Sequence, residues 1–216
     1  MMKTSLKCTE FPRRWLTATL VKTAMDAYDA PINEQREQRM SNLPAQRLFL
    51  GFAVPARQTR QLQQLQQRCL TQMPKARPVS ADNLHLTLAF LGQTTDNIRQ
   101  QLVREIPALP LKEFVLTLTP LEHWPKPRIL CLTGVATEPL LTLANAAAAL
   151  SARLALAKQA LCYRPHVTLL RHVNAAPDAI SAAPLCLSPR HLNLYASISQ
   201  PEGVRYQVLQ RWPLLA

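Results

Sequence analysis

Glycine is scarce in this chain of 216 residues, which contains only four. Walker-type phosphate loops and dinucleotide-binding turns need several glycines within a few positions. The four glycines, Gly51, Gly92, Gly134 and Gly203, stand far apart. Their separation excludes the common nucleotide-binding loops.

Paired cysteines are also missing. The five cysteines are Cys8, Cys69, Cys131, Cys162 and Cys186. No two of them form a C-x-x-C pair, which argues against a zinc finger or a disulfide framework and for a reducing compartment. His123, His172 and His191 could join Cys162 around a metal. Because they lack ligand spacing and a carboxylate cluster, we expect no metal and no cofactor.

Long apolar runs are absent as well. The most apolar stretch, residues 139–161, is interrupted by Arg153 and Lys158, which a membrane-spanning helix would expose to lipid. Residues 1–40 lack the continuous apolar core of a signal peptide. We therefore expect a cytoplasmic protein that does not associate with membranes.

Acidic residues are few relative to basic ones. The 25 Lys and Arg residues against 13 Asp and Glu give a formal net charge of +12 and a sequence pI of about 10.1. Residues 43–216 hold 18 of those basic residues and 8 of the acidic ones. The positive charge thus belongs to the body of the chain and favours a partner that carries phosphates.

The pattern of polar and apolar residues changes near Met40. The segment before it is polar and weakly periodic, whereas residues 47–53 have the pattern of a buried strand. We interpret residues 1–42 as an N-terminal extension, either a disordered appendage or the product of a start codon placed upstream of Met40. Residues 43–216 are predicted to form one domain.

Hydrophobic periodicity predicts helices and strands in alternation. Helices are expected after Pro55, after Asp96 as a capping residue, and from Pro139 onward. Strands are expected at residues 47–53, 84–91, 114–119, 128–134, 166–170, 191–197 and 204–211. The resulting order βαβαββαβββ indicates an α+β fold with antiparallel pairing.

One strand pattern occurs twice. The sequence His-Leu-Thr-Leu at residues 85–88 recurs as His-Val-Thr-Leu at residues 166–169, and a long helix is predicted before each copy. Side chains alternate along a strand, so each histidine shares a face with the threonine two residues later. Two such strands related by a pseudo-two-fold axis would line one cleft with two imidazoles and two hydroxyls.

This set of side chains suits phosphodiester chemistry that needs no metal. In-line displacement at phosphorus places the entering and leaving oxygens on opposite sides, so one histidine can deprotonate water while the other protonates the departing alkoxide. Histidine fits both roles because its ordinary pKa is about 6.5. Threonine hydroxyls can donate hydrogen bonds to the non-bridging oxygens. A single copy would fit a structural histidine, whereas two copies indicate a catalytic pair.

With these motifs the chain resembles the 2H phosphoesterases and, within them, the bacterial RNA 2′,3′-cyclic phosphodiesterases, also called 2′-5′ RNA ligases. The resemblance rests on residues 47–55, 83–92, 164–171 and 194–197, and it covers about residues 43–213. It implies two pseudo-symmetric lobes of antiparallel-rich sheet with helices outside and a central cleft. Cys131 stands where we expect an aromatic residue in close relatives.

The resemblance also implies an activity. It is the hydrolysis of RNA 2′,3′-cyclic phosphate ends to 2′-phosphates, with a reversible 2′-5′ RNA ligase activity. RNA such as tRNA fragments is the implied partner, and we expect a monomer.

The resemblance assigns roles to five residues of this sequence. His85 would be the proton donor to the leaving 3′ oxygen, and His166 the proton acceptor that activates water. Thr87 and Thr168 would hold the phosphate, and Arg171 would add a cationic contact. Strict alternation places Arg171 on the face opposite His166, so its role requires a twist or bulge at the end of the strand.

Further residues are candidates for RNA contacts. Phe52, Trp124 and Tyr195 could stack on a nucleobase, with packing in the core as the alternative. A set of arginines could guide the RNA backbone, with simple solvation as the alternative. These are Arg47, Arg77, Arg128, Arg164 and Arg190.

Two other functions stay open. A 2H phosphoesterase acting on small cyclic nucleotides or on 2′-5′ oligoadenylate would use the same motif residues. A non-catalytic RNA-binding module would keep the basic surface and use its histidines structurally.

Overall fold

The computed structural model describes residues 45–160, 162–178 and 180–216. The predicted N-terminal extension, residues 1–42, lies outside the described residues. All the candidate site residues named in the sequence fall inside them.

The described residues form one antiparallel sheet with helices packed around it. The strands are β1 (Gln46–Ala53), β2 (Arg77–Pro78), β3 (His85–Thr94), β4 (Leu116–Trp124), β5 (Ile129–Gly134), β6 (His166–Arg171), β7 (Leu185–Leu187), β8 (His191–Gln200) and β9 (Gly203–Pro213). The helices are α2 (Ala56–Gln72), α3 (Asp96–Glu105) and α4 (Glu138–Arg153), with short 3-10 turns η1 (Ala81–Asn83) and η2 (Ile106–Ala108). The strand order is β7-β4-β5-β6-β3-β1-β8-β9, with β2 also pairing to β6.

The sheet consists of two halves that meet between β6 and β3. At this junction Leu86 of β3 pairs with Val167 of β6. On either side of this junction the order β5-β6 mirrors β1-β3, and each pair is connected through a helix, as β5-α4-β6 and β1-α2-β3. The two motif strands are therefore equivalent neighbours across a pseudo-two-fold axis, which confirms the predicted two-lobed α+β fold.

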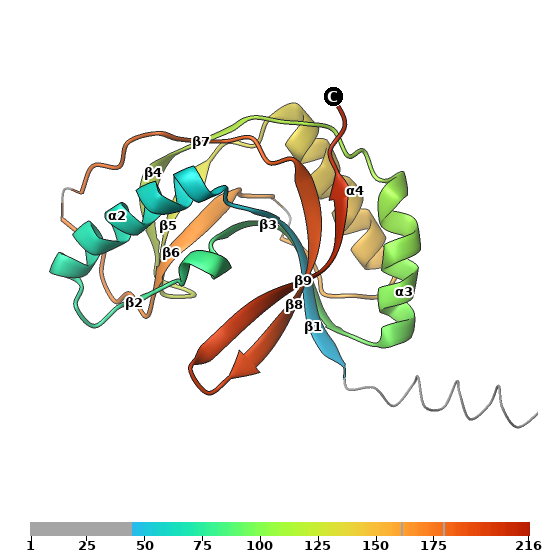
Figure 1. The fold of residues 1–216 in the computed structure, drawn as a ribbon, viewed down its shortest axis with the longest axis horizontal. Coiled ribbons are helices and arrows are strands. Elements are labelled where there is room, and N and C mark those ends of the chain that lie inside the picture. The colour runs from blue at the N-terminus through green and yellow to red at the C-terminus, as the bar shows by residue number, and fades with distance from the viewer. Residues whose placement is uncertain (1–44, 161, 179) are drawn as a thin grey trace, which may run out of the picture. The chain divides into compact units, whose positions relative to one another are not determined.

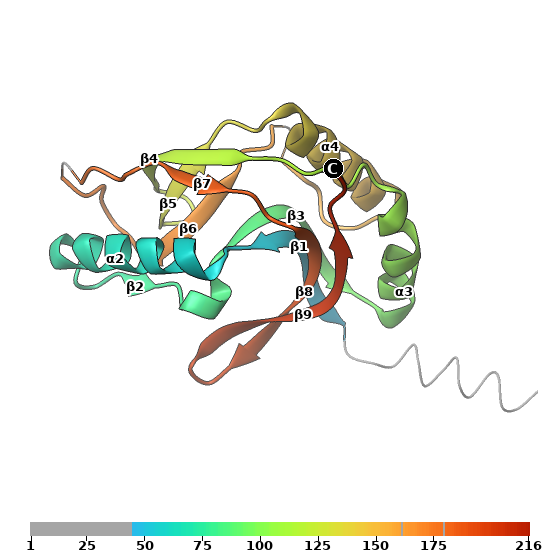
Figure 2. The same cartoon turned by 45° about the horizontal axis from the view of Figure 1, so that its top comes forward.

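Each connecting helix crosses to the other half of the sheet. Helix α2 follows β1 but contacts β6 and β7, and α4 follows β5 but contacts β3. Figures 1 and 2 show α2 along the half that holds β4 to β7, with α3 and α4 on the opposite side of the molecule. Each of these two helices therefore packs on strands of the opposite half, and this packing holds the two halves of the sheet together.

The helices are held by the apolar stripes that the sequence predicts. In α2 the buried side chains are Leu62, Leu65, Gln66 and Cys69. In α4 they are Leu140, Leu143, Ala144, Ala147, Leu150 and Ser151. Burying such a stripe against the sheet removes apolar surface from water at about 25 cal/mol per Å². No helix in the described part of the chain is both long enough and apolar enough to cross a membrane.

The predicted element order is confirmed, with differences at element ends. The short strands β2 and β7 escaped prediction because two or three residues show no periodicity. The cap of α3 is Thr95, whose side chain accepts from the Ile98 N–H, and not Asp96 as predicted. The predicted strand 114–119 is shifted, since β4 runs from Leu116 to Trp124.

Candidate active site

The two motif histidines occupy equivalent positions in the sheet. His85 is the first residue of β3, and His166 is the first residue of β6. Each ring is held by the backbone two residues earlier: Nδ1 of His85 bonds to the Asn83 carbonyl at 2.7 Å, and Nδ1 of His166 bonds to the Arg164 carbonyl at 2.8 Å. Because a carbonyl can only accept, both Nδ1 atoms carry a proton.

This hydrogen bond determines the tautomer of both rings. With Nδ1 protonated, Nε2 of a neutral ring has its lone pair free to accept a proton. The Thr87 hydroxyl lies 2.9 Å from Nε2 of His85 and can donate to it. Both histidines thus present the nitrogen that performs acid and base chemistry.

His85 lies among aromatic rings. Phe49 and Tyr206 lie with ring centroids 4.9 and 5.0 Å from the imidazole, and Tyr195 lies at 6.1 Å. Burial above all, together with the positive charges of Arg171 and His166, lowers the pKa of His85 to about 4, against the opposing effect of the Asn83 hydrogen bond. In the free protein this ring is neutral at pH 7.

His166 has a more polar environment. The Trp124 ring centroid lies 4.6 Å from its imidazole, and the Arg164 guanidinium lies 4.5 Å above the Trp124 ring. Glu122 accepts at 2.8 Å from both the Trp124 Nε1–H and Arg164 Nη2. Burial lowers the pKa of His166, and the positive charges of Arg164 and Arg171 act in the same direction. The hydrogen bond to the Arg164 carbonyl and, to a smaller extent, the Glu122 carboxylate oppose them. The two rings are therefore electrostatically different despite their symmetry.

A bulge follows each motif. In β6 the register with β5 shifts so that Leu169 is skipped between the pairs Cys131–Thr168 and Leu130–Leu170. In β3 the register with β1 shifts at the equivalent residue, Leu88. An extra residue in one strand reverses the alternation beyond it. The side chain of Arg171 thereby returns to the face of His166 and Thr168.

The charge of Arg171 reaches both histidines. Its guanidinium lowers the pKa of His85 and of His166. The bulge that its predicted role requires is present in the register of β6 with β5, and the positive charge of Arg171 acts on both imidazoles. Thr168 is half-buried on the same face of β6.

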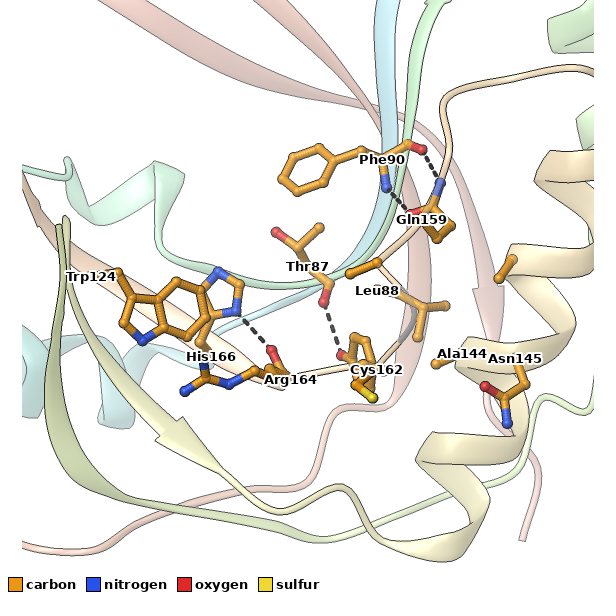
Figure 3. A pocket seen from close by; sticks show the side chains of 13 residues that line it. Thr87, Leu88, Phe90, Trp124, Ala144, Asn145, Gln159, Cys162, Arg164 and His166 are labelled. Carbon is orange, nitrogen blue, oxygen red and sulfur yellow. Dashed lines mark hydrogen bonds between the residues drawn. The ribbon is translucent and has the colours of Figure 1, made fainter. Parts of the chain in front are cut away.

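A cavity of about 210 Å³ opens beside the two motifs, as Figure 3 shows. Its lining residues come from both halves of the sheet, from α4 and from the segment before β6. They include Thr87, Phe90, Trp124, Asn145, Tyr163 and His166. The Tyr163 hydroxyl donates to the Thr87 carbonyl at 2.9 Å and so ties the segment before β6 to β3. The cavity thus adjoins a motif residue from each half.

The structure separates the three aromatic candidates. Trp124 lines the cavity, as a stacking role requires. Phe52 is only 1% exposed and packs on Phe114 in the core, so its predicted contact with a nucleobase is wrong. Tyr195 is 5% exposed and stacked behind Phe49, which leaves it no free face for a base. In both cases the contacts of the folded chain decide which aromatic side chain faces the cleft: Phe52 points into the core, and Phe49 covers Tyr195.

Sequence reasoning missed an aromatic residue in the cavity wall. Phe90 is 56% exposed, and its backbone is held by Gln159, which accepts from the Phe90 N–H at 3.1 Å. Phe90 follows His85 by five positions, as Arg171 follows His166. Comparing the two copies of the repeated motif could therefore have identified Phe90. Cys131, by contrast, is fully buried and offers no stacking surface.

Among the described residues, no three His, Cys, Asp or Glu side chains gather closely enough to hold a metal ion. His191 and Cys162 are exposed on separate segments, and His123 bonds through Nε2 to the Val173 carbonyl at 3.3 Å.

Comparisons with known proteins agree on one family. The family model described as LigT like Phosphoesterase matches residues 52–131. The RNA 2′,3′-cyclic phosphodiesterase of Escherichia coli (strain K12) is 34% identical over 176 residues, which cover 78% of this chain and 97% of that protein.

Solved structures match a similar share of the chain. The crystal structure of E. coli LigT complexed with NADP+ gives a TM-score of 0.73 at 30% identity, covering 81% of this chain and 100% of that one. The crystal structure of E. coli LigT complexed with 3′-AMP gives a TM-score of 0.70 at 30% identity, covering 80% and 99%.

Proposed function

Because the chain belongs to the LigT-like phosphoesterase family, we propose that it hydrolyses RNA ends carrying a 2′,3′-cyclic phosphate and leaves a 2′-phosphate. The observation that carries the proposal is the symmetric pair of imidazoles. Each has its Nδ1 held by a backbone carbonyl, which leaves Nε2 as the nitrogen that exchanges protons, and the two rings lie on adjacent strands. In-line displacement requires one such group on each side of the phosphorus.

The proposed reaction assigns a proton transfer to each ring. His166 Nε2 removes a proton from water as the water oxygen forms a bond to phosphorus. The bond from phosphorus to the 3′ oxygen breaks, and His85 Nε2 donates its proton to that oxygen. The product carries a 2′-phosphomonoester and a 3′-hydroxyl, and solvent then returns both rings to their starting states.

The donor role requires His85 to gain a proton before the reaction. Burial keeps its ring neutral in the free protein, with a pKa of about 4. The cyclic phosphate carries a negative charge, and an opposite charge within a few ångströms raises the pKa of a histidine. Substrate binding would thus raise the pKa of His85 and favour the protonated donor.

The charge that develops on phosphate would be stabilised by three side chains. The Thr87 hydroxyl already lies beside His85, and Thr168 and Arg171 lie on the facing strand. A hydroxyl or guanidinium aimed at the non-bridging oxygens acts most strongly in a partly water-excluded cleft. We infer that these residues bind the reacting phosphate.

The cavity would take the nucleoside. Phe90 and Trp124 contribute aromatic surface from the two halves of the sheet. Bases of single-stranded RNA stack on such rings with little dependence on sequence. E. coli LigT has been solved in complex with 3′-AMP, so a relative with this fold binds a nucleotide.

Ligation would use the same geometry. If the 5′-hydroxyl of a second RNA replaces water beside His166, the displacement yields a 2′-5′ phosphodiester and a 3′-hydroxyl. This activity stays a prediction. Incubating a cyclic-ended RNA with a 5′-hydroxyl RNA and separating the products by length would detect it.

The first test of the proposed function is phosphorus NMR. An RNA with a 2′,3′-cyclic end, incubated with the protein in excess chelator, should lose its cyclic phosphate signal and gain that of a 2′-phosphomonoester. A persistent cyclic signal would contradict the proposal. Turnover of a mononucleotide or of 2′-5′ oligoadenylate instead would identify a different 2H substrate, and salt-dependent RNA binding without product would identify a binding module.

The roles of the two histidines are tested with alanine variants. His85→Ala and His166→Ala should each lower turnover by about 10²- to 10⁴-fold, the usual contribution of a general acid or base. His191→Ala, at an exposed histidine, serves as the control and should retain full activity.

A sulfur-substituted substrate separates donor from acceptor. When sulfur replaces the 3′ oxygen, the leaving thiolate needs little protonation because a thiol has a pKa of about 8.5. The loss in His85→Ala should then largely disappear, whereas the loss in His166→Ala should persist. Recovery of the His166 variant instead would reverse the two roles.

A further inference from the structure

Two arginines face each other at the end of the second motif strand. In the register of β2 with β6, Arg77 lies directly opposite Arg171. Directly opposed residues of antiparallel strands project from the same face of the sheet. Arg77 therefore projects from the same face of the sheet as Arg171. It lies on β2, which pairs with β6 on the side away from β5.

The register that opposes these arginines is held by a buried side chain. Gln66 of α2 is 5% exposed and donates to the carbonyls of Val79 at 2.8 Å and Leu169 at 2.9 Å. The Val79 N–H also donates to the Leu169 carbonyl at 2.9 Å. Strand β2 is thus attached to β6 at the bulge itself, immediately beside Arg77.

No carboxylate compensates this pair within the part of the chain that the structure describes. The ion pairs there join Arg99 to Asp96, Arg153 to Glu105, Arg164 to Glu122 and Arg190 to Glu113. Like charges directly opposite each other across strands are destabilising. An anion bound between or along them would remove that cost, so the pair has the charge arrangement of an anion-binding surface.

The two arginines differ in their distance from the histidines. Arg171 lowers the pKa of both imidazoles, whereas Arg77 is not among the charges that shift either one. Arg171 lies on β6, the strand that also carries His166 and Thr168, whereas Arg77 lies one strand away on β2, so Arg171 is the arginine nearer to the reacting phosphate. Adjacent strands are about 4.8 Å apart, so the two opposed arginine side chains can reach two neighbouring anionic groups of one ligand.

The substrate offers one phosphate next to the reacting one. In an RNA with a 2′,3′-cyclic end, the neighbouring phosphate is the phosphodiester on the 5′ side of the terminal nucleoside. We propose that Arg77 binds this phosphodiester, so that the site favours cyclic-ended oligonucleotides over cyclic mononucleotides. The inference rests on the proposed function and adds a specificity-determining residue to it.

The experiment compares three substrates in the full chain. They are adenosine 2′,3′-cyclic phosphate, the same nucleotide with a 5′-phosphate, and a cyclic-ended adenosine dinucleotide. Arg77→Gln should lower kcat/KM about tenfold for the two substrates that carry a 5′ phosphate, as expected for one lost charge-assisted contact. For the first substrate, kcat/KM should change less than twofold. Arg60→Gln, which removes the same charge from an exposed position of α2, is the matched control and should affect none of them.

Salt dependence gives a second readout. For the dinucleotide, the slope of log kcat/KM against log salt concentration should become shallower by about 0.7 in Arg77→Gln, the contribution of one phosphate contact to a single strand. Equal losses on all three substrates would place Arg77 on the reacting phosphate and overturn the proposal. An unchanged dinucleotide rate would also overturn it. If the wild-type protein turns over none of the three, the proposed function itself fails, which is a separate outcome.

Discussion

At the scale of single residues, the same motif produces two chemically different histidines. His85 lies among Phe49, Tyr195 and Tyr206, whereas His166 lies beside Trp124 and within the field of Glu122. Aromatic burial favours the neutral ring, and a nearby carboxylate favours the charged one. In the free protein the pKa of both rings is lowered, so the donor role of His85 depends on the substrate phosphate, whose negative charge would raise the pKa of that ring.

This asymmetry predicts how activity depends on pH. At pH values above about 6.5 in the free protein, His166 is already neutral, and the protonated fraction of His85 falls tenfold with each further pH unit. The value of kcat/KM should therefore fall tenfold per unit above that pH. In the complex the phosphate raises the pKa of His85, so kcat should begin to fall at a higher pH. Profiles of both parameters against pH check this, and coincident basic limbs would contradict it.

At the scale of secondary structure, the bulges decide what each motif strand presents. Without the skipped Leu169, Arg171 would project from the face opposite His166. The equivalent bulge at Leu88 turns Phe90 toward the cavity. The same kind of bulge thus occurs in both motif strands. It turns a cationic side chain toward the cleft in one half of the sheet and an aromatic ring toward it in the other.

The bulge in β3 also depends on a close approach to β1. Gly51 lies opposite Thr87, and a Cβ added to it would lie 2.7 Å from the backbone oxygen of Leu86. Gly51→Ala should therefore displace the motif strand, with a loss of about 1–3 kcal/mol in the free energy of unfolding and a loss of activity.

Denaturant unfolding and turnover measure the two effects of Gly51→Ala. Gln46→Ala, at an exposed position of the same strand, is the control and should leave both quantities unchanged. Wild-type stability in the glycine variant would show that the strands adjust without strain.

At the scale of the whole molecule, the candidate active site forms where the two halves of the sheet meet. The halves share the junction of Leu86 with Val167, the Tyr163 hydrogen bond to β3, and the exchanged positions of α2 and α4. Every residue proposed to act on phosphate lies in β2, β3 or β6. The predicted monomer, cytoplasmic location and tRNA-fragment substrates stay predictions.

The predicted domain boundary can be tested by truncation. A chain that begins at Leu43 contains all elements of the described sheet, whose first strand starts at Gln46. It should retain its circular dichroism spectrum and its kcat/KM on a cyclic-ended RNA within about twofold. A folded but inactive truncated chain would show that residues 1–42 contribute to the reaction.

The sequence by itself determined the elements that depend on local pattern. The repeated His-x-Thr, with apolar residues between, specified two half-buried strands and the side chains that share a face, because alternation is a local property of extended backbone. The apolar stripes of α2 and α4 were likewise readable at helical spacing. The catalytic candidates and the order of the elements followed from these local rules.

Only the tertiary structure decided which side chains reach the cleft. Phe52 and Tyr195 match the composition of a stacking site, yet one lies in the core and the other behind Phe49. Phe90 and Arg77 gained their positions from bulges and from the pairing of β2 with β6. These features depend on contacts between residues far apart in the chain, such as Gln66 with Leu169, whose pairing no local pattern encodes.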